Sequence, residues 1–178
     1  MSRIVIPQSI PAESKAVVDG ISRQLKLTPN LFRIMAQSPQ ALNGWAGLQG
    51  ALAKTLDVKT RDGIALAVSQ ANGCRYCLSA HSHVAREFVG LSDDEIRRNR
   101  LGESESPRVA AAVAFARKLV EARGKVTAAD LDAVRAAGYS DANVVEIIAL
   151  SAQFLLTNFV NNVFDTEIDF PVVDAEVA

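Results

Sequence analysis

Helix start and stop signals recur along this chain, and no run between them alternates polar and apolar residues as a strand does. Thr28-Pro29 and Ser38-Pro39 are each typical of an N-cap followed by a proline at the first helical position, and Gly73, Gly90 and Gly138 accept the left-handed conformation that ends many helices. The segments between these signals predict helices over residues 12–25, 29–36, 39–56, 60–72, 74–89, 107–120, 127–138 and 140–163. The pattern predicts an all-α fold.

Several side chains are expected to fix the ends of these helices. Thr60 is expected to cap the helix that follows it, and Ser92 to open a short charged helix through a capping box with Glu95. Residues 1–11 and the tail after Phe164 are expected to be extended. We expect the tail to wrap a surface of the same chain or of a neighbour.

Size and composition favour one globular domain over residues 1–178. Hydrophobic residues make up 49% of the chain, enough for a real core, and the net charge of −1 draws it neither to nucleic acid nor to an anionic membrane. No run approaches the roughly 20 uninterrupted apolar residues of a membrane span, and the opening residues lack a signal peptide's apolar core. We therefore expect a cytoplasmic protein that binds no membrane.

The segment over residues 140–163 is apolar on most of its faces. Such a helix lies either at the centre of a fold or between subunits, so it favours a homo-oligomer. Three asparagines interrupt its end, and we expect them to satisfy helix ends or subunit contacts, with contact to the cysteine site as the less favoured interpretation. They are Asn158, Asn161 and Asn162.

The chain has two cysteines and two histidines, all within ten residues: Cys74, Cys77, His81 and His83. A disulfide between cysteines this close constrains the unfolded chain little, so a structural staple is excluded. In a reducing compartment such a pair is more often catalytic or metal-binding. The spacing therefore singles out this segment as the candidate functional site.

At a helix start, Cys74 lies in the first turn and Cys77 one turn later on the same side. Free N–H groups there favour the thiolate, the reactive form of cysteine. His81, four residues after Cys77, can hold the thiolate or move its proton. If residues 72–73 make a tight turn, Asp62 on the preceding helix can face His81, although it also fits an ordinary surface charge.

Residues 61–96, RDGIALAVSQANGCRYCLSAHSHVAREFVGLSDDEI, resemble the core motif of the AhpD-like alkylhydroperoxidases in the carboxymuconolactone decarboxylase family. LLTNFVNNVFDTEIDFP, residues 155–171 within the C-terminal helix and tail (140–178), resembles the peroxidase-related branch. The resemblance implies an AhpD-like helical bundle, assembled as a trimer or hexamer, that reduces alkyl hydroperoxides without a cofactor. It also implies that Cys77 forms the sulfenic acid, that Cys74 resolves it and that His81 relays protons.

Two positions depart from the family pattern. Asp62 stands where the family has glutamate, and this shorter side chain is expected to reach its partner through a water. Tyr76 stands where AhpD has histidine, and a neutral phenol is a poorer proton carrier than imidazole. Tyr76 is therefore expected to line the pocket as a packing side chain. The departures leave the rate and the identity of the relay open.

Other interpretations of the same residues remain. The cysteines can be buried apolar thiols, or ligands of zinc together with the two histidines. His81 and His83 point to nearly opposite sides of one helix, so a zinc site needs ligands from another chain. His83 is expected to be solvated or at an interface, with a place beside the pocket as the alternative. Arg75 is expected to be exposed, although its charge can favour a thiolate at Cys74.

Three functions follow from these interpretations. The first is a peroxidase that needs an external dithiol reductant. The second is a carboxymuconolactone-decarboxylase-like enzyme, which does not depend on the two cysteines. The third is a dithiol redox sensor that is oxidised without turnover. A thioredoxin-like fold is excluded because βαβ patterning is absent.

Overall fold

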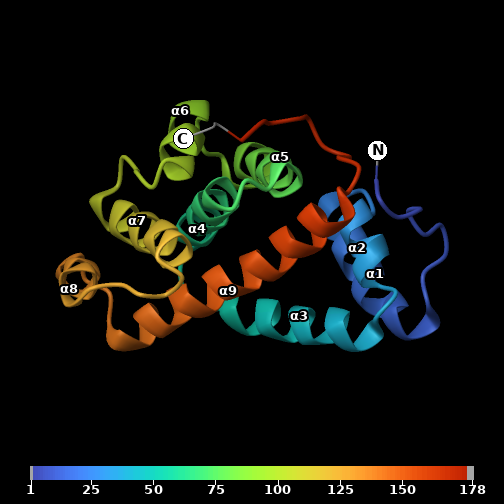
Figure 1. Cartoon of the computed structure of the whole chain (residues 1–178), viewed down its shortest axis with the longest axis horizontal. Coiled ribbons are helices and arrows are strands. Elements are labelled where there is room, and N and C mark those ends of the chain that lie inside the picture. Colours follow the sequence, from blue (N-terminus) through green and yellow to red (C-terminus); the bar gives the residue numbers. More distant parts are fainter. Residues whose placement is uncertain (1, 176–178) are drawn as a thin grey trace.

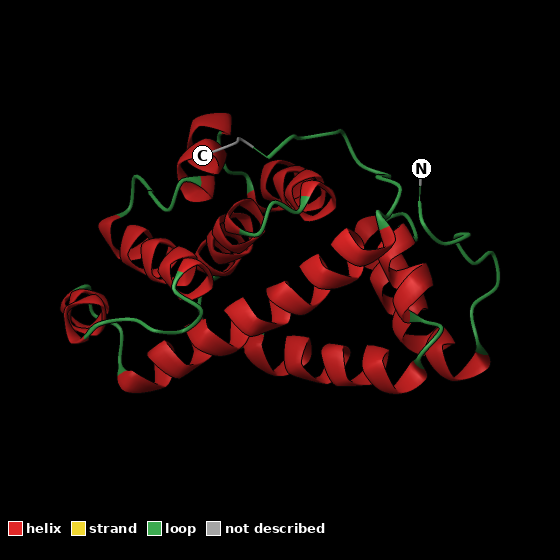
Figure 2. Ribbon diagram, in the orientation of Figure 1, coloured by secondary structure: helices red, strands yellow, loops and turns green. Residues whose placement is uncertain are grey.

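The computed structural model describes residues 2–175, and within them the regular elements are all helices (Figures 1 and 2). The prediction of an all-α fold is confirmed. The elements are α1 (Ala12–Leu25), α2 (Asn30–Met35), α3 (Pro39–Leu52), α4 (Val58–Ala71), α5 (Arg75–Val84), α6 (Asp93–Arg100), α7 (Pro107–Glu121), α8 (Ala128–Ala136) and α9 (Asp141–Phe164). A π-helical turn over Ala85–Val89 continues α5 to Gly90.

Most helix starts lie where the sequence predicts them. Ser38 and Ser106 each accept a backbone N–H as N-caps, and both precede a proline in the first turn. Thr127 and Ser140 form capping boxes at the starts of α8 and α9. Ser92 caps α6, and its partner Glu95 accepts hydrogen bonds from Ser104 and Glu105 instead.

Two predicted caps are wrong, and α3 ends four residues early, at Leu52. Asp57 caps α4 by accepting the backbone N–H of Thr60, because its carboxylate lies three residues before that donor. Thr28 does not cap α2; its hydroxyl contacts that of Ser22, and Pro29 is the N-cap without a side-chain bond. In both cases the hydrogen bond is formed with a different polar group from the one that the sequence spacing predicts.

The centre of the molecule is α4, which packs against α5, α6, α7 and α9. Ile64, Leu66 and Val68 are fully buried there, and each such burial stabilises the fold by about 1.5–3 kcal/mol. Gly63 lets α4 approach α6 and α7 closely, since a Cβ at this position would lie 2.4 Å from Asn99 Oδ1. Because α4 is packed on several sides, it fixes the position of α5, the next helix along the chain.

The longest helix, α9, runs diagonally through the molecule, with α3 on one side and α4, α5 and α7 on the other (Figure 1). By length and composition alone it is apolar enough to cross a membrane, with a mean hydropathy of 1.5 over 18 residues. It carries buried polar side chains that contact α3, α4 and α5, which is typical of a core helix. One face of α9 remains exposed at Val145, Leu156, Phe159 and Val163.

A second apolar cluster joins the N-terminal helices to the start of α5. Its buried members are Val18, Leu31, Phe32, Met35, Ala36, Leu42, Cys74, Tyr76, Cys77 and Phe170. The last of these belongs to the tail after α9, which returns across α5. Both cysteines therefore lie inside a packed cluster formed by α1, α2, α3, α5 and the tail.

Candidate active site

Cys74 is the N-cap of α5, one position earlier than the first helical turn predicted for it. Its sulfur accepts the backbone N–H of Cys77 at 3.4 Å, and its side chain is completely buried. Gly73, with φ +61°, makes the sharp turn that separates α4 from α5. A hydrogen bond with Cys77, together with burial, raises the pKa of the Cys74 thiol. Cys74 is therefore held as the neutral thiol.

Cys77 lies one turn further along α5, 3% exposed, with a free thiol. Its sulfur accepts a hydrogen bond from Asn161 Nδ2 at 3.2 Å. The hydrogen bond with the Cys74 thiol is the main cause that lowers the pKa of Cys77 to about 7, against the opposing effect of burial. The charge of His81 and the amide groups of Asn161 and Asn158 lower it further. The two thiols are thus unequal, and Cys77 carries the thiolate.

His81 and Asp62 are in direct contact, with Nδ1 3.3 Å from Oδ1. This contact shows that α4 and α5 are antiparallel, as expected from the turn at Gly73. It also corrects the expectation that aspartate needs a bridging water here. Burial alone would lower the pKa of His81, but the hydrogen bond and charge of Asp62 and the charge of Cys77 raise it overall. Asp62 and Cys77 therefore favour the charged form of the imidazole.

The asparagines of α9 form part of this site, which corrects the interpretation favoured from the sequence. Asn161 contacts the sulfur of Cys77, and Asn158 donates to Ser69 on α4 at 3.3 Å. Only Asn162 behaves as expected, because it donates to the carbonyl of Asn72 at the end of α4. The sequence feature that could have indicated these contacts is the presence of Asn158 and Asn161 within an apolar helix, because burying an amide is costly unless it has a hydrogen-bond partner.

Cys77 opens into a cavity of about 570 Å³. Its wall is formed by residues of α1, α2, α3, α4, α5 and α9 and by Phe170 of the tail. Most of these side chains are apolar or aromatic, and Cys77, His81 and Asp62 are among the polar ones. The His81 side chain keeps 25% of its surface exposed, and its ring meets Phe154 edge-on. The arrangement presents a thiolate and an imidazole to a small organic molecule.

Tyr76 lines the same cavity as a fixed packing residue, as predicted. Its hydroxyl donates to Asp169 Oδ1 at 2.7 Å and accepts the backbone N–H of Leu31 at 3.2 Å. Burial and the nearby charge of Asp169 raise its pKa, so the phenol keeps its proton. Tyr76 therefore ties α5 to α2 and to the tail.

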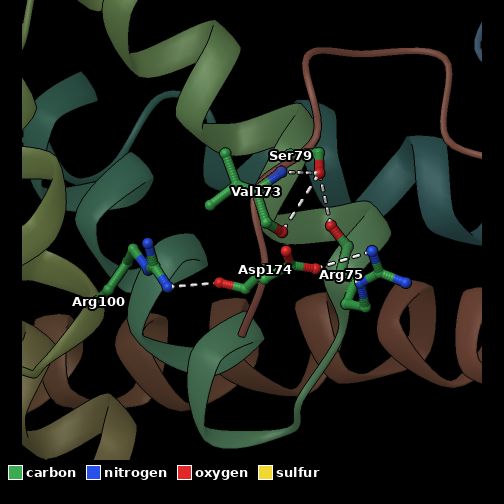
Figure 3. Close-up of polar contacts among 5 residues, drawn as sticks. All are labelled: Arg75, Ser79, Arg100, Val173 and Asp174. Atoms are coloured by element: carbon green, nitrogen blue, oxygen red, sulfur yellow. Dashed lines mark hydrogen bonds and ion pairs between the residues drawn. The ribbon is translucent and has the colours of Figure 1, made fainter. Parts of the chain in front are cut away.

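The tail fastens to the outer face of α5 through contacts that Figure 3 shows. The backbone N–H of Val173 donates to Ser79 Oγ at 2.9 Å, and Arg75 Nε donates to Asp174 Oδ1 at 2.7 Å. Arg100 on α6 donates to the backbone carbonyl of Asp174. Arg75 is exposed, as expected, and its guanidinium pairs with Asp174 of the tail rather than with the thiol of Cys74. The tail thus wraps a surface of its own chain.

His83 is not among the residues that line the cavity. Its ring contacts Phe88 and Phe170, and Phe170 is itself a lining residue. Within residues 2–175 no three histidine, cysteine, aspartate or glutamate side chains are grouped as a metal would require.

The fold and this dithiol site define a class of all-helical proteins with a Cys-x-x-Cys pair at the start of a buried helix. Residues 39–118 match the model of the carboxymuconolactone decarboxylase family. The fold is AhpD-like, and the match to this family model supports the resemblance seen in the sequence. No curated protein matches the sequence.

Solved structures of similar fold extend over nearly the whole chain. A peroxidase-related protein with an alkylhydroperoxidase AhpD core, from Ralstonia eutropha JMP134, is 26% identical, with 94% of this chain and 92% of that chain covered and a TM-score of 0.82. A peroxidase-related protein from Silicibacter sp. TM1040 is 23% identical, with 93% and 91% covered and a TM-score of 0.80. The debrominase Bmp8 is 24% identical, with 89% and 87% covered and a TM-score of 0.75. These neighbours show that the AhpD-like fold extends over nearly the whole chain.

Proposed function

We propose that the protein is a thiol-dependent peroxidase that reduces organic hydroperoxides through a dithiol–disulfide cycle of Cys77 and Cys74. The observation that carries this proposal is the inequality of the two thiols. Cys77 faces the cavity with a lowered pKa, while Cys74 lies behind it as a buried neutral thiol. A peroxidase needs this division between an attacking thiolate and a resolving thiol.

In the first step the thiolate of Cys77 attacks the terminal oxygen of the hydroperoxide. An S–O bond forms, the O–O bond breaks, and the electron pair leaves with the alkoxide. The charged imidazole of His81 gives its proton to the alkoxide, which departs as the alcohol. Asp62 holds the imidazole in place and favours its charged form. Asn161 keeps the sulfur of Cys77 aimed at the cavity.

In the second step the sulfur of Cys74 attacks the sulfenic acid of Cys77. A disulfide forms and water leaves, with the proton of the Cys74 thiol passing to the departing hydroxide. An external dithiol then reduces the disulfide by exchange, which restores both thiols and oxidises the reductant to its own disulfide. The sum is one hydroperoxide and one dithiol converted to an alcohol, water and a disulfide.

Turnover with cumene hydroperoxide and dithiothreitol tests the proposal. Wild type is expected to consume peroxide catalytically and Cys77→Ser to be inactive. When dithiothreitol, which reduces a sulfenic acid directly, is left out, Cys74→Ser is expected to consume one equivalent of peroxide and stop at the sulfenic acid. Peroxide consumption that survives in Cys77→Ser contradicts the proposal. Oxidation of one equivalent without turnover would favour the redox-sensor alternative, and decarboxylation of a lactone acid by Cys77→Ser would favour the decarboxylase alternative.

A further inference from the structure

The cavity wall contains one cation that the proposed peroxidase chemistry does not use. Arg61, half-buried in the first turn of α4, lines the cavity. One guanidinium N–H donates to the backbone carbonyl of Leu56, which anchors the side chain. Among residues 2–175 Arg61 forms no ion pair with a carboxylate, and the carboxylate of its chain neighbour Asp62 contacts His81 through Oδ1 instead. The remaining N–H groups of Arg61 have no protein acceptor.

The cavity that Arg61 lines is mainly apolar. Trp45 and Ala53 of α3, Val58 of α4 and Ile21 of α1 contribute to its wall, together with the neutral polar side chains of Gln24 and Gln49. A guanidinium is costly to hold among apolar side chains without a counter-charge, and it matches the planar geometry of a carboxylate through two parallel N–H donors. The wall is therefore suited to a ligand with an apolar body and one anionic group.

The helix geometry places this cation away from the reactive sulfur. His81 lies beside Asp62, the neighbour of Arg61 on α4. Cys77 precedes His81 by four residues on α5, which is about 6 Å along the helix axis. A ligand that reaches both Arg61 and Cys77 must therefore carry its anionic group and its reactive group at opposite ends.

We propose that the cavity selects amphiphilic hydroperoxides, which place a carboxylate on Arg61 and the hydroperoxide group on Cys77, with an apolar body between them. This inference rests on the proposed peroxidase for the reaction, but the recognition of the carboxylate is a separate property of the cavity. The separation fits an aryl hydroperoxide with a carboxylate in the para position.

Binding of unreactive analogues tests the recognition without any turnover. The reduced protein is titrated with 4-isopropylbenzoate and, as a neutral match, 4-isopropylbenzyl alcohol. Trp45, the single tryptophan of the chain, lines the cavity and reports occupancy by its fluorescence, with calorimetry as a second readout. Wild type is expected to bind the carboxylate about tenfold more tightly than the alcohol, as a charge-assisted hydrogen-bonded pair should.

Arg61→Gln is expected to abolish this preference because it weakens binding of the carboxylate more than binding of the alcohol, while Arg61→Lys keeps part of the preference. Arg97→Gln is the matched control, because it removes one positive charge from an exposed position on α6 and should preserve the preference. Thermal unfolding by circular dichroism establishes that each variant is folded. Equal binding of both ligands, a preference that persists in Arg61→Gln, or no binding of either ligand by calorimetry would overturn the inference.

A second experiment measures turnover and compares cumene hydroperoxide with its 4-carboxy derivative. The ratio of kcat/KM for the acid over the neutral substrate is expected to fall about tenfold in Arg61→Gln. If the protein binds the carboxylate through Arg61 but consumes neither peroxide, the peroxidase proposal fails and the recognition of an anionic ligand stands. If both peroxides are consumed equally by wild type and Arg61→Gln, the selectivity fails and the peroxidase stands.

Discussion

Replacing Asn161 by leucine is expected to raise the pKa of Cys77 without unfolding the protein. The amide donates to the sulfur at 3.2 Å, so the substitution removes a hydrogen bond to the charged form. Its Oδ1 atom is buried without a partner, and leucine of similar size removes this unsatisfied atom as well. The fold should therefore tolerate the change.

The size of the shift follows from the strength of the bond. A hydrogen bond to a charged group contributes about 1.5–3 kcal/mol, and one pKa unit corresponds to about 1.36 kcal/mol. The pKa of Cys77 should therefore rise from about 7 by roughly one to two units, close to the value of an ordinary thiol. Because only the thiolate reacts, the rate at pH 6 should fall about tenfold or more, and the variant should recover as the pH rises above about 8.

The chain offers a direct assay for each thiol. Trypsin cleaves after Arg75, so Cys74 and Cys77 fall in separate peptides, residues 62–75 and 76–86. The rate of alkylation by iodoacetamide is measured for each peptide across pH. Asn162→Leu serves as the control, because Asn162 contacts the carbonyl of Asn72 rather than the sulfur. An unchanged midpoint for Cys77 in Asn161→Leu, or an equal shift in Asn162→Leu, would refute the reasoning.

Further expectations concern the relay, the core and the assembly. Asp62→Asn removes the charge and hydrogen-bonding carboxylate that oppose burial, so the pKa of His81 should fall, and an unchanged NMR titration would contradict this. Gly63→Ala should lower the free energy of unfolding by about 1–3 kcal/mol through overlap with Asn99, and urea denaturation with equal or greater stability would contradict it. Gel filtration with light scattering should show a trimer or hexamer, and a monomer at micromolar concentration would argue against the predicted oligomer.

The sequence predicted the parts of this fold and site that depend on neighbours along the chain. Ser38, Thr127 and Ser140 cap helices because each lies a fixed three residues from the backbone N–H it accepts. The contact between Asp62 and His81 was also accessible, because a tight turn at Gly73 makes two helices antiparallel and brings these positions level. Local spacing was enough in each case.

Contacts between distant segments were beyond such reasoning. Asn161 is 84 residues from Cys77, and no spacing rule relates α9 to the start of α5. The cavity likewise depends on how α1, α3 and α4 are arranged around it, so Arg61 could not be distinguished from an ordinary surface arginine. The bonds of the tail to Ser79 and Tyr76 depend on a path that only the folded chain defines.

The most direct test of the central claim is the intact mass and free-thiol count after one equivalent of cumene hydroperoxide is added to the reduced protein. Wild type should lose two hydrogens and both thiols, and the disulfide should link the peptides 62–75 and 76–86. Cys74→Ser should gain one oxygen on the peptide that holds Cys77, and Cys77→Ser should remain unmodified. If both thiols of wild type stay free in excess peroxide, the dithiol is not a peroxidase centre and the account is wrong.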